Sequence, residues 1–274
     1  MKSALATKCE DEEIRQQYLK KTTRPDLDPA VYKKYFMNPS SEVVQRTLKN
    51  TTRYGNIKLR IPMRQHYKSR NPLLSRRHIS EDYATDTWIS TVTSYEGYNC
   101  AQIFCGVKSK HVSQYGMNKE SNGPDALLDF FRQEGVPLSM VRDNSKMQIG
   151  KLWTEYCRRY WVKDKFVEPY HSNQNPAERM MSEQKEKIQR LMIDTGCDPE
   201  AWFSAASHVA DVHNCLANES IEWQTPTQLR DGETPDISSL IQHQFWDLVY
   251  FAQYEVDFPT KEQMKVSVDD LVEH

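Results

Sequence analysis

The sequence predicts an α/β domain whose mixed five-stranded sheet is flanked by helices. Segments rich in β-branched and aromatic residues predict strands, and segments with apolar residues at helical spacing predict helices. The strand-like segments are 83–92, 98–107, 112–117, 137–142, 161–167 and, near the C-terminus, 245–251. The first three follow one another without a helix, which predicts an antiparallel meander. The order βββαβαβαα then predicts a mixed sheet.

Four helices in the core are predicted from apolar periodicity. Their ranges are 121–135, 148–160, 176–195 and 198–217. The third has the clearest boundaries, because Asn175 supplies a capping side chain, Pro176 suits the first helical position and Gly196 ends the segment. Upstream of the core, Ser40 is predicted to cap a short helix that ends near Asn50.

The distribution of charge separates the core from two extensions. We predict a polar and basic N-terminal extension with short helices at 1–77, a core domain at 78–238 and an acidic C-terminal extension at 239–274. From Val43 to Ser80 there are ten Lys or Arg residues and no Asp or Glu. Such a segment is typical of a chain that binds a polyanion such as nucleic acid. A solvated basic linker is the alternative interpretation.

The composition excludes several classes of protein. No run of 18 apolar residues is present, so no membrane-spanning helix is expected. The six cysteines include no C-x2-C pair, so we expect reduced thiols in an intracellular compartment and no structural zinc site. The first residues lack the apolar core of a secretory signal.

Three acidic residues stand where a metal-dependent phosphodiester enzyme needs carboxylates. Asp86 lies in the first strand-like segment, Asp143 follows the fourth, and Glu178 comes 35 positions later at the start of a predicted helix. Such enzymes activate a weak nucleophile and stabilise the leaving oxygen with two Mg²⁺ ions, which prefer oxygen ligands. Each acid alone also fits an ordinary strand, turn or helix-start position. Together with the order of elements, they favour a ribonuclease-H-like architecture.

The sequence around these acids resembles the catalytic core of retroviral and retrotransposon integrases. The run Val141-Arg142-Asp143-Asn144 is similar to the segment around an integrase catalytic aspartate. Residues 169–179 resemble the loop and helix that carry the catalytic glutamate. Residues 225–236 resemble the ending of copia-type LTR-retrotransposon integrases. The similarity extends, in preserved order, from about Ser80 to Phe251.

The resemblance implies a set of metal ligands and a set of DNA contacts. Asp86, Asp143 and Glu178 would be the catalytic residues and would hold two Mg²⁺ or Mn²⁺ ions. The residues expected to contact DNA or to support its binding are Asn144, Tyr170, Gln174, Arg179 and Lys185. For Lys185 the alternative is an ordinary exposed helix lysine.

The expected activity is that of an integrase: metal-dependent processing of a DNA 3′ end, followed by transfer of that end to a target strand. Element-end DNA and target DNA would be the partners, and a homo-oligomer is expected because joining two ends needs two active sites. The protein would act inside the cell, in the nucleus or in a retrotransposon particle.

Two departures from the family leave other interpretations open. Neither the zinc-binding H-x-H…C-x2-C segment before the core nor a basic segment after it is present. The chain is therefore expected to be a fragment, or a diverged or domesticated copy. A catalytically inactive nucleic-acid-binding remnant is the first alternative, and a hydrolytic nuclease on the same fold is the second.

Overall fold

A mixed five-stranded sheet forms the centre of the structure, a computed structural model that describes residues 28–53, 77–142, 150–166, 176–248, 250–252 and 271–273. Its strands are β1 (His78–Ile89), β2 (Cys100–Gly106), β3 (Val112–Met117), β4 (Val136–Arg142) and β5 (Lys163–Phe166). Their order is β3-β2-β1-β4-β5. The first three strands pair antiparallel, whereas β4 is parallel to both β1 and β5. The predicted fold class, an α/β domain with a mixed five-stranded sheet flanked by helices, is confirmed.

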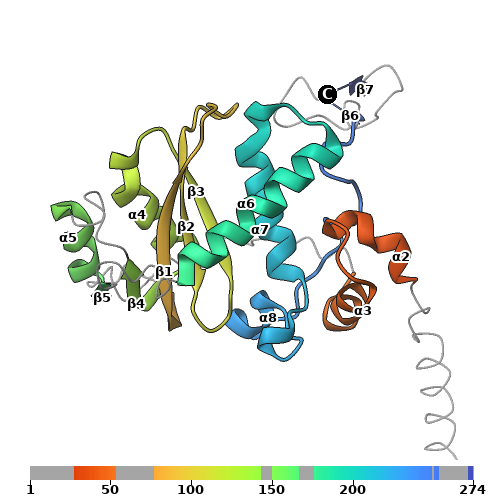
Figure 1. Cartoon of the computed structure of the whole chain (residues 1–274). Coiled ribbons are helices and arrows are strands. Elements are labelled where there is room, and N and C mark those ends of the chain that lie inside the picture. Colours follow the sequence, from red (N-terminus) through yellow and green to blue (C-terminus); the bar gives the residue numbers. More distant parts are fainter. Residues whose placement is uncertain are drawn as a thin grey trace, which may run out of the picture.

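Helices cover both faces of this sheet. Figure 1 shows α4 and α5 on one side of the strands and α6 and α7 on the other. Their bounds are α4 (Gly123–Gln133), α5 (Lys151–Arg159), α6 (Pro176–Thr195) and α7 (Trp202–Cys215). Across the part of the chain that the structure describes, no helix is both long and apolar enough to span a membrane.

Each face of the sheet has its own apolar core. On one face, Phe104 of β2 stacks on Phe130 of α4 with ring centroids 4.4 Å apart, and Trp153 of α5 joins the same cluster. On the other face, Ile103 of β2 packs with Met180 of α6. Successive strand residues point to opposite faces, so the alternation of apolar residues along β2 attaches a helical layer to each side.

The shorter elements of the described chain are α2 (Pro29–Tyr32), η1 (Lys33–Phe36), α3 (Ser41–Asn50), η3 (Glu120–Asn122), η5 (Pro199–Ala201), η6 (Glu219–Ile221), α8 (Pro226–Asp231), β6 (Tyr250–Ala252) and β7 (Leu271–Glu273).

The N-terminal helices pack against α7. Ser40 Oγ accepts a hydrogen bond from Val43 N–H, which confirms the predicted cap of α3. Val44 and Leu48 of that helix are buried in a cluster with Val212 of α7. Residues 28–53 are thereby attached to the core.

Two of the predicted strands are interrupted by local turns, and the predicted strand ends at 90–92, 98–99 and 107 also lie outside β1 and β2. Trp161 is exposed and adopts a left-handed conformation with φ of 60°, so β5 begins only at Lys163. The strand predicted at 245–251 is wrong over 245–248, where Gln244 N–H donates to the Asp247 carboxylate and closes a turn. In both places a local turn prevails over the strand propensity of the aromatic residues.

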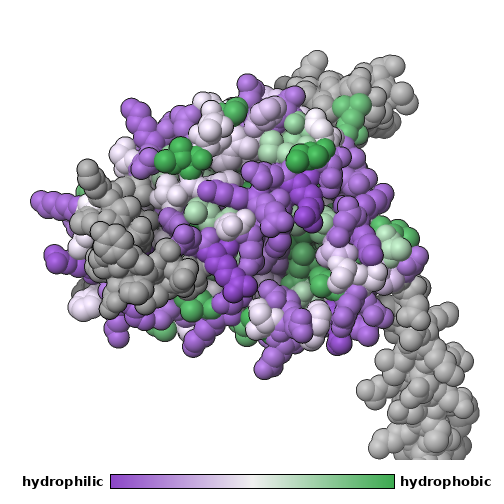
Figure 2. Space-filling view, in the orientation of Figure 1, coloured by the Kyte–Doolittle hydropathy of each residue, from purple (hydrophilic) through white to green (hydrophobic). Residues whose placement is uncertain are grey.

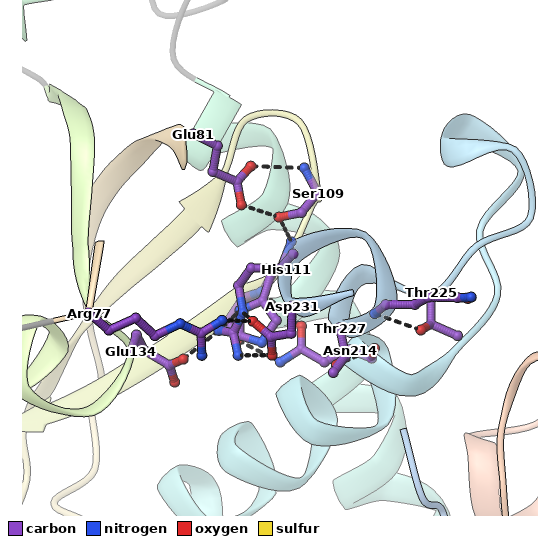
Figure 3. A network of polar contacts seen from close by, with 12 residues as sticks. Arg77, Glu81, Ser109, His111, Glu134, Asn214, Thr225, Thr227 and Asp231 are labelled. Carbon is purple, nitrogen blue, oxygen red and sulfur yellow. Dashed lines mark hydrogen bonds and ion pairs between the residues drawn. The ribbon is translucent and has the colours of Figure 1, made fainter. Parts of the chain in front are cut away.

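A buried polar network joins α8 to the sheet and to α4. Arg230, with a side chain only 9% exposed, donates two hydrogen bonds of 2.8 Å to the Asp231 carboxylate and also bonds to Glu134 and to His111 Nδ1. Arg77 donates to Asp231 from the chain just before β1. In Figure 3, Arg77, His111, Glu134 and Asp231 converge from four separate segments. Burial alone would raise the pKa of Asp231, but its hydrogen bonds with the two arginines hold that pKa below its ordinary value.

His213 of α7 is a buried neutral imidazole. Its Nε2–H donates to the Lys110 carbonyl oxygen at 3.0 Å, which leaves Nδ1 as an acceptor. Burial, together with the nearby ammonium of Lys187, lowers the pKa of His213 to about 4. The folded protein therefore binds a proton at this ring less readily than the unfolded chain, whose histidines titrate at about 6.5.

We expect His213 to make the fold less stable in mild acid. A lowered folded-state pKa contributes stability that is complete above about pH 6.5 and is lost as the pH falls toward about 4. The loss at the low end of this range should be about 3 kcal/mol. Urea unfolding at pH 7, 5.5 and 4.5 measures it, and His213→Gln, which keeps a donor for the Lys110 carbonyl, should be less sensitive to pH. If the free energy of unfolding depends on pH equally in the two proteins, His213 is not the cause of the loss.

Candidate active site

Asp86 lies on the face of the sheet that α6 covers. In β1 it stands directly opposite Ile103 of β2, and opposed residues of antiparallel strands share a face. Ile103 packs against Met180 of α6, so the half-buried Asp86 side chain belongs to the same layer. Its Oδ1 accepts a hydrogen bond of 2.7 Å from Thr87 N–H. A strand in the middle of the sheet thus carries this carboxylate on a rigid support.

The end of β4 lies beside Asp86. Thr85 of β1 is paired with Arg142, the last residue of β4, in the parallel ladder. The next residue in the sequence is Asp143, which lies outside the described residues together with Asn144. The described ladder therefore ends at Arg142, level with Thr85, which is the residue next to Asp86.

Arg142 is a residue whose contribution the sequence analysis missed. Its side chain is 1% exposed, and it donates two hydrogen bonds to Asp164 of β5, Nε to Oδ1 at 3.0 Å and Nη2 to Oδ2 at 2.7 Å. The guanidinium also lies 5.8 Å from the Trp153 ring centroid. This bidentate pair fixes the end of β4. The only signal in the sequence was an arginine at the end of an apolar run, with an acid in the following strand.

Glu178 occupies the first turn of α6. Its side chain is exposed, whereas Ala177 and Met180 beside it are buried. The helix N-terminus carries partial positive charge, which favours an acidic side chain or a phosphate there. Gly196, with φ of 65°, ends the helix as predicted.

A contact between Lys185 and Trp88 connects α6 to β1. Lys185 Nζ lies 5.6 Å from the centroid of the Trp88 ring. Trp88 is two residues after Asp86 and therefore on the same face of β1, while Lys185 lies two turns after Glu178 on α6. The contact joins the middle of α6 to the strand that carries Asp86. Lys185 is half-buried and is not simply an exposed helix lysine.

The remaining predicted DNA contacts differ in their surroundings. Arg179 is 88% exposed and forms an ion pair with Glu183, Nε to Oε1 at 3.2 Å. It is accessible to a large polyanion. Tyr170 and Gln174 lie outside the described residues, so their roles stay predictions.

The donor chemistry fits a hard divalent cation. Asp86 and Glu178 offer carboxylate oxygens from β1 and α6, which pack against each other. Mg²⁺ needs few protein ligands because it keeps several waters. Within the described ranges, no group of three His, Cys, Asp or Glu side chains is arranged to hold a metal ion. The predicted set includes Asp143, which is outside those ranges, so the metal site stays a prediction.

This chain is similar in structure to several solved proteins. No protein-family model matches the sequence, and no curated protein matches it. The HTLV-2 integrase catalytic core domain in complex with magnesium (trimeric form) is 19% identical, with a TM-score of 0.44 over 55% of this chain and 96% of that one. The catalytic core domain of BIV integrase is 16% identical, with a TM-score of 0.44 over 55% and 93%. A chain of the simian T-cell lymphotropic virus intasome in complex with PP2A regulatory subunit B56 gamma is 16% identical, with a TM-score of 0.45 over 68% and 70%.

Proposed function

We propose that this chain is a polynucleotidyl transferase of the integrase kind, which processes a DNA 3′ end and joins it to a target strand. The observation that supports the proposal is the arrangement of β1, β4 and α6. Asp86 lies on the α6 face of β1, the residue before Asp143 is paired with the neighbour of Asp86, and Glu178 begins the helix that packs there. We also propose the finer assignment to a copia-type retrotransposon integrase, which the sequence motifs carry.

In this proposal Asp86, Asp143 and Glu178 hold two Mg²⁺ or Mn²⁺ ions. The bound ions would activate the attacking oxygen, which is water in the first step and a 3′-hydroxyl in the second, and would stabilise charge on the leaving oxygen. The protein contributes rigid support: β1 carries one carboxylate, the Arg142–Asp164 pair fixes the strand end before the second, and the Lys185–Trp88 contact holds the helix of the third.

The DNA partners are bound through exposed basic groups in the same proposal. Arg179 directly follows Glu178 in the sequence and is largely exposed. A phosphate of the element end can therefore reach it. Its present partner, Glu183, is on the same helix, and an exposed i,i+4 pair costs little to break. Two copies of the chain would act together, because each DNA end needs its own set of carboxylates.

A strand-transfer assay tests this function. The full chain is incubated with Mg²⁺ or Mn²⁺, short duplexes with randomised ends and a supercoiled plasmid, and joined products are sequenced. We expect joining that EDTA abolishes and that Asp143→Asn abolishes while the fold is retained. DNA binding without nicking or joining would overturn the enzyme in favour of an inactive remnant. Nicked plasmid without joined product would indicate a hydrolytic nuclease instead.

A further inference from the structure

A groove of about 410 Å³ lies beside the junction of the N-terminal helices with the core. It lies between the η1–α3 connection, the middle of α6 and the end of α7 with the segment that follows. Figure 2 shows apolar side chains between hydrophilic ones in the region where Figure 1 places α6 beside the N-terminal helices. Among the described residues predicted to act on DNA, neither Asp86 nor Glu178, Arg179 or Lys185 lines this groove.

A desolvated ammonium group lines the groove. Lys187 of α6 contacts the Nδ1 atom of His213 at 3.5 Å, and the other nitrogen of that ring donates to a carbonyl. Burial lowers the pKa of Lys187 and outweighs the opposite effect of the nearby Glu183 and Glu186 carboxylates. In the described part of the chain, Lys187 forms no ion pair with a carboxylate. Its remaining N–H donors are therefore available to a ligand, since an ammonium group has three.

The neighbouring charges are engaged elsewhere or exposed. Glu183, one turn before Lys187, is paired with Arg179. Arg190, on the groove wall, is paired with Glu186 at 3.5 Å. Glu219 at the far wall is exposed to solvent. The groove therefore presents one partly buried positive charge, which matches a ligand with a single negative charge better than a strongly hydrated dianion.

The walls of the groove are mainly apolar and are held in an unusual backbone conformation. Met37, Val43, Leu216 and Trp223 provide half-buried apolar surface. Met37 and Trp223 have φ of 61° and 62°, in the left-handed region that bulky residues rarely adopt. Both follow the end of a short helix: Met37 N–H donates to the Lys33 carbonyl and Trp223 N–H to the Asn218 carbonyl, which fixes the backbone at these two points of the wall.

We propose that this groove binds a small organic carboxylate whose apolar body packs between the N-terminal helices and α7 while its carboxylate accepts hydrogen bonds from Lys187. The site is separate from the DNA chemistry and does not depend on it. An apolar pocket with one convergent charged group is the usual form of a small-molecule site.

Calorimetric titration of the full-length protein with sodium octanoate tests the proposal. We expect octanoate to bind, and acetate and octylammonium not to bind, because one lacks the apolar body and the other carries the wrong charge. Lys187→Met should weaken octanoate binding roughly 10- to 100-fold, the effect of losing a charge-assisted hydrogen bond. Lys187→Arg keeps the charge and should retain most of the affinity.

Lys49→Met is the matched control, because Lys49 is exposed on α3 and does not line the groove. It should bind octanoate like the unmodified protein. Thermal melts of all variants show whether each is folded. Equal binding of octylammonium, or unchanged octanoate binding by folded Lys187→Met, would overturn the proposal. So would the absence of octanoate binding to the unmodified protein.

Discussion

Replacement of Asp86 by asparagine is expected to lower the rate of metal-dependent DNA joining by about 10³-fold, or about 4 kcal/mol of transition-state stabilisation. Asparagine has nearly the same size and can still accept the hydrogen bond from Thr87 N–H, so the fold should be retained. The change removes the negative charge that a pair of divalent ions would require. Joined product is measured with the same randomised duplexes and plasmid.

Asp82→Asn is the matched control for this prediction. Asp82 lies four residues earlier on β1, on the same face, and its carboxylate is paired with Lys165 of β5 at 2.7 Å. The two variants lose the same charge from the same strand, but only one of them belongs to the predicted metal site. Asp82→Asn should join DNA within a few-fold of the unmodified rate. Comparable losses in both variants would show that the effect is structural, and full activity of Asp86→Asn would refute the catalytic role.

Replacement of Arg230 by methionine is expected to destabilise the fold by about 3–5 kcal/mol, the cost of leaving buried partners of an ion pair without their cation. Arg230 is almost completely buried and bonds to Glu134, Asp231 and His111. Methionine fills similar space but supplies no donor, so two partly buried carboxylates lose their main partner. The free energy of unfolding in urea at pH 7 measures the loss.

Arg132→Met provides the comparison for Arg230. Arg132 is paired with Asp129 on α4 at 3.2 Å, but both side chains are about half exposed. Exposed pairs of this kind contribute about 0–1 kcal/mol. We therefore expect little change in this variant. A loss for Arg230→Met no larger than that for Arg132→Met would contradict the view that the network holds α8 to the sheet.

Much of the fold could be predicted because its signals are local. Pro176 and Gly196 bound α6 where the sequence predicted, since proline suits a first helical turn and glycine readily adopts the left-handed conformation that ends a helix. The strand that includes Asp86 was predicted from its Thr, Trp and Ile content. The errors arose where a turn competed with aromatic strand formers, at Trp161 and at 245–248.

The candidate site could be predicted only in part. Spacing and neighbouring motifs singled out Asp86 and Glu178, and the structure describes them on elements that pack together. The motifs did not indicate that Arg142 is buried against Asp164, or that Lys185 lies over the Trp88 ring. These contacts join residues from different strands and helices, so no local pattern contains them. Asp143, Tyr170 and Gln174 lie outside the described residues, and their roles stay predictions.

Local chemistry along the chain was sufficient to determine the type and order of the core helices and strands, because capping, periodicity and strand propensity act over a few residues. It also singled out the three acids as candidates. Only the three-dimensional packing decided which face of β1 meets α6, that residues 28–53 lie against α7, and that Lys187 faces a groove. Burial and pairing depend on neighbours that are distant in the sequence, and those neighbours are brought together only by the complete fold.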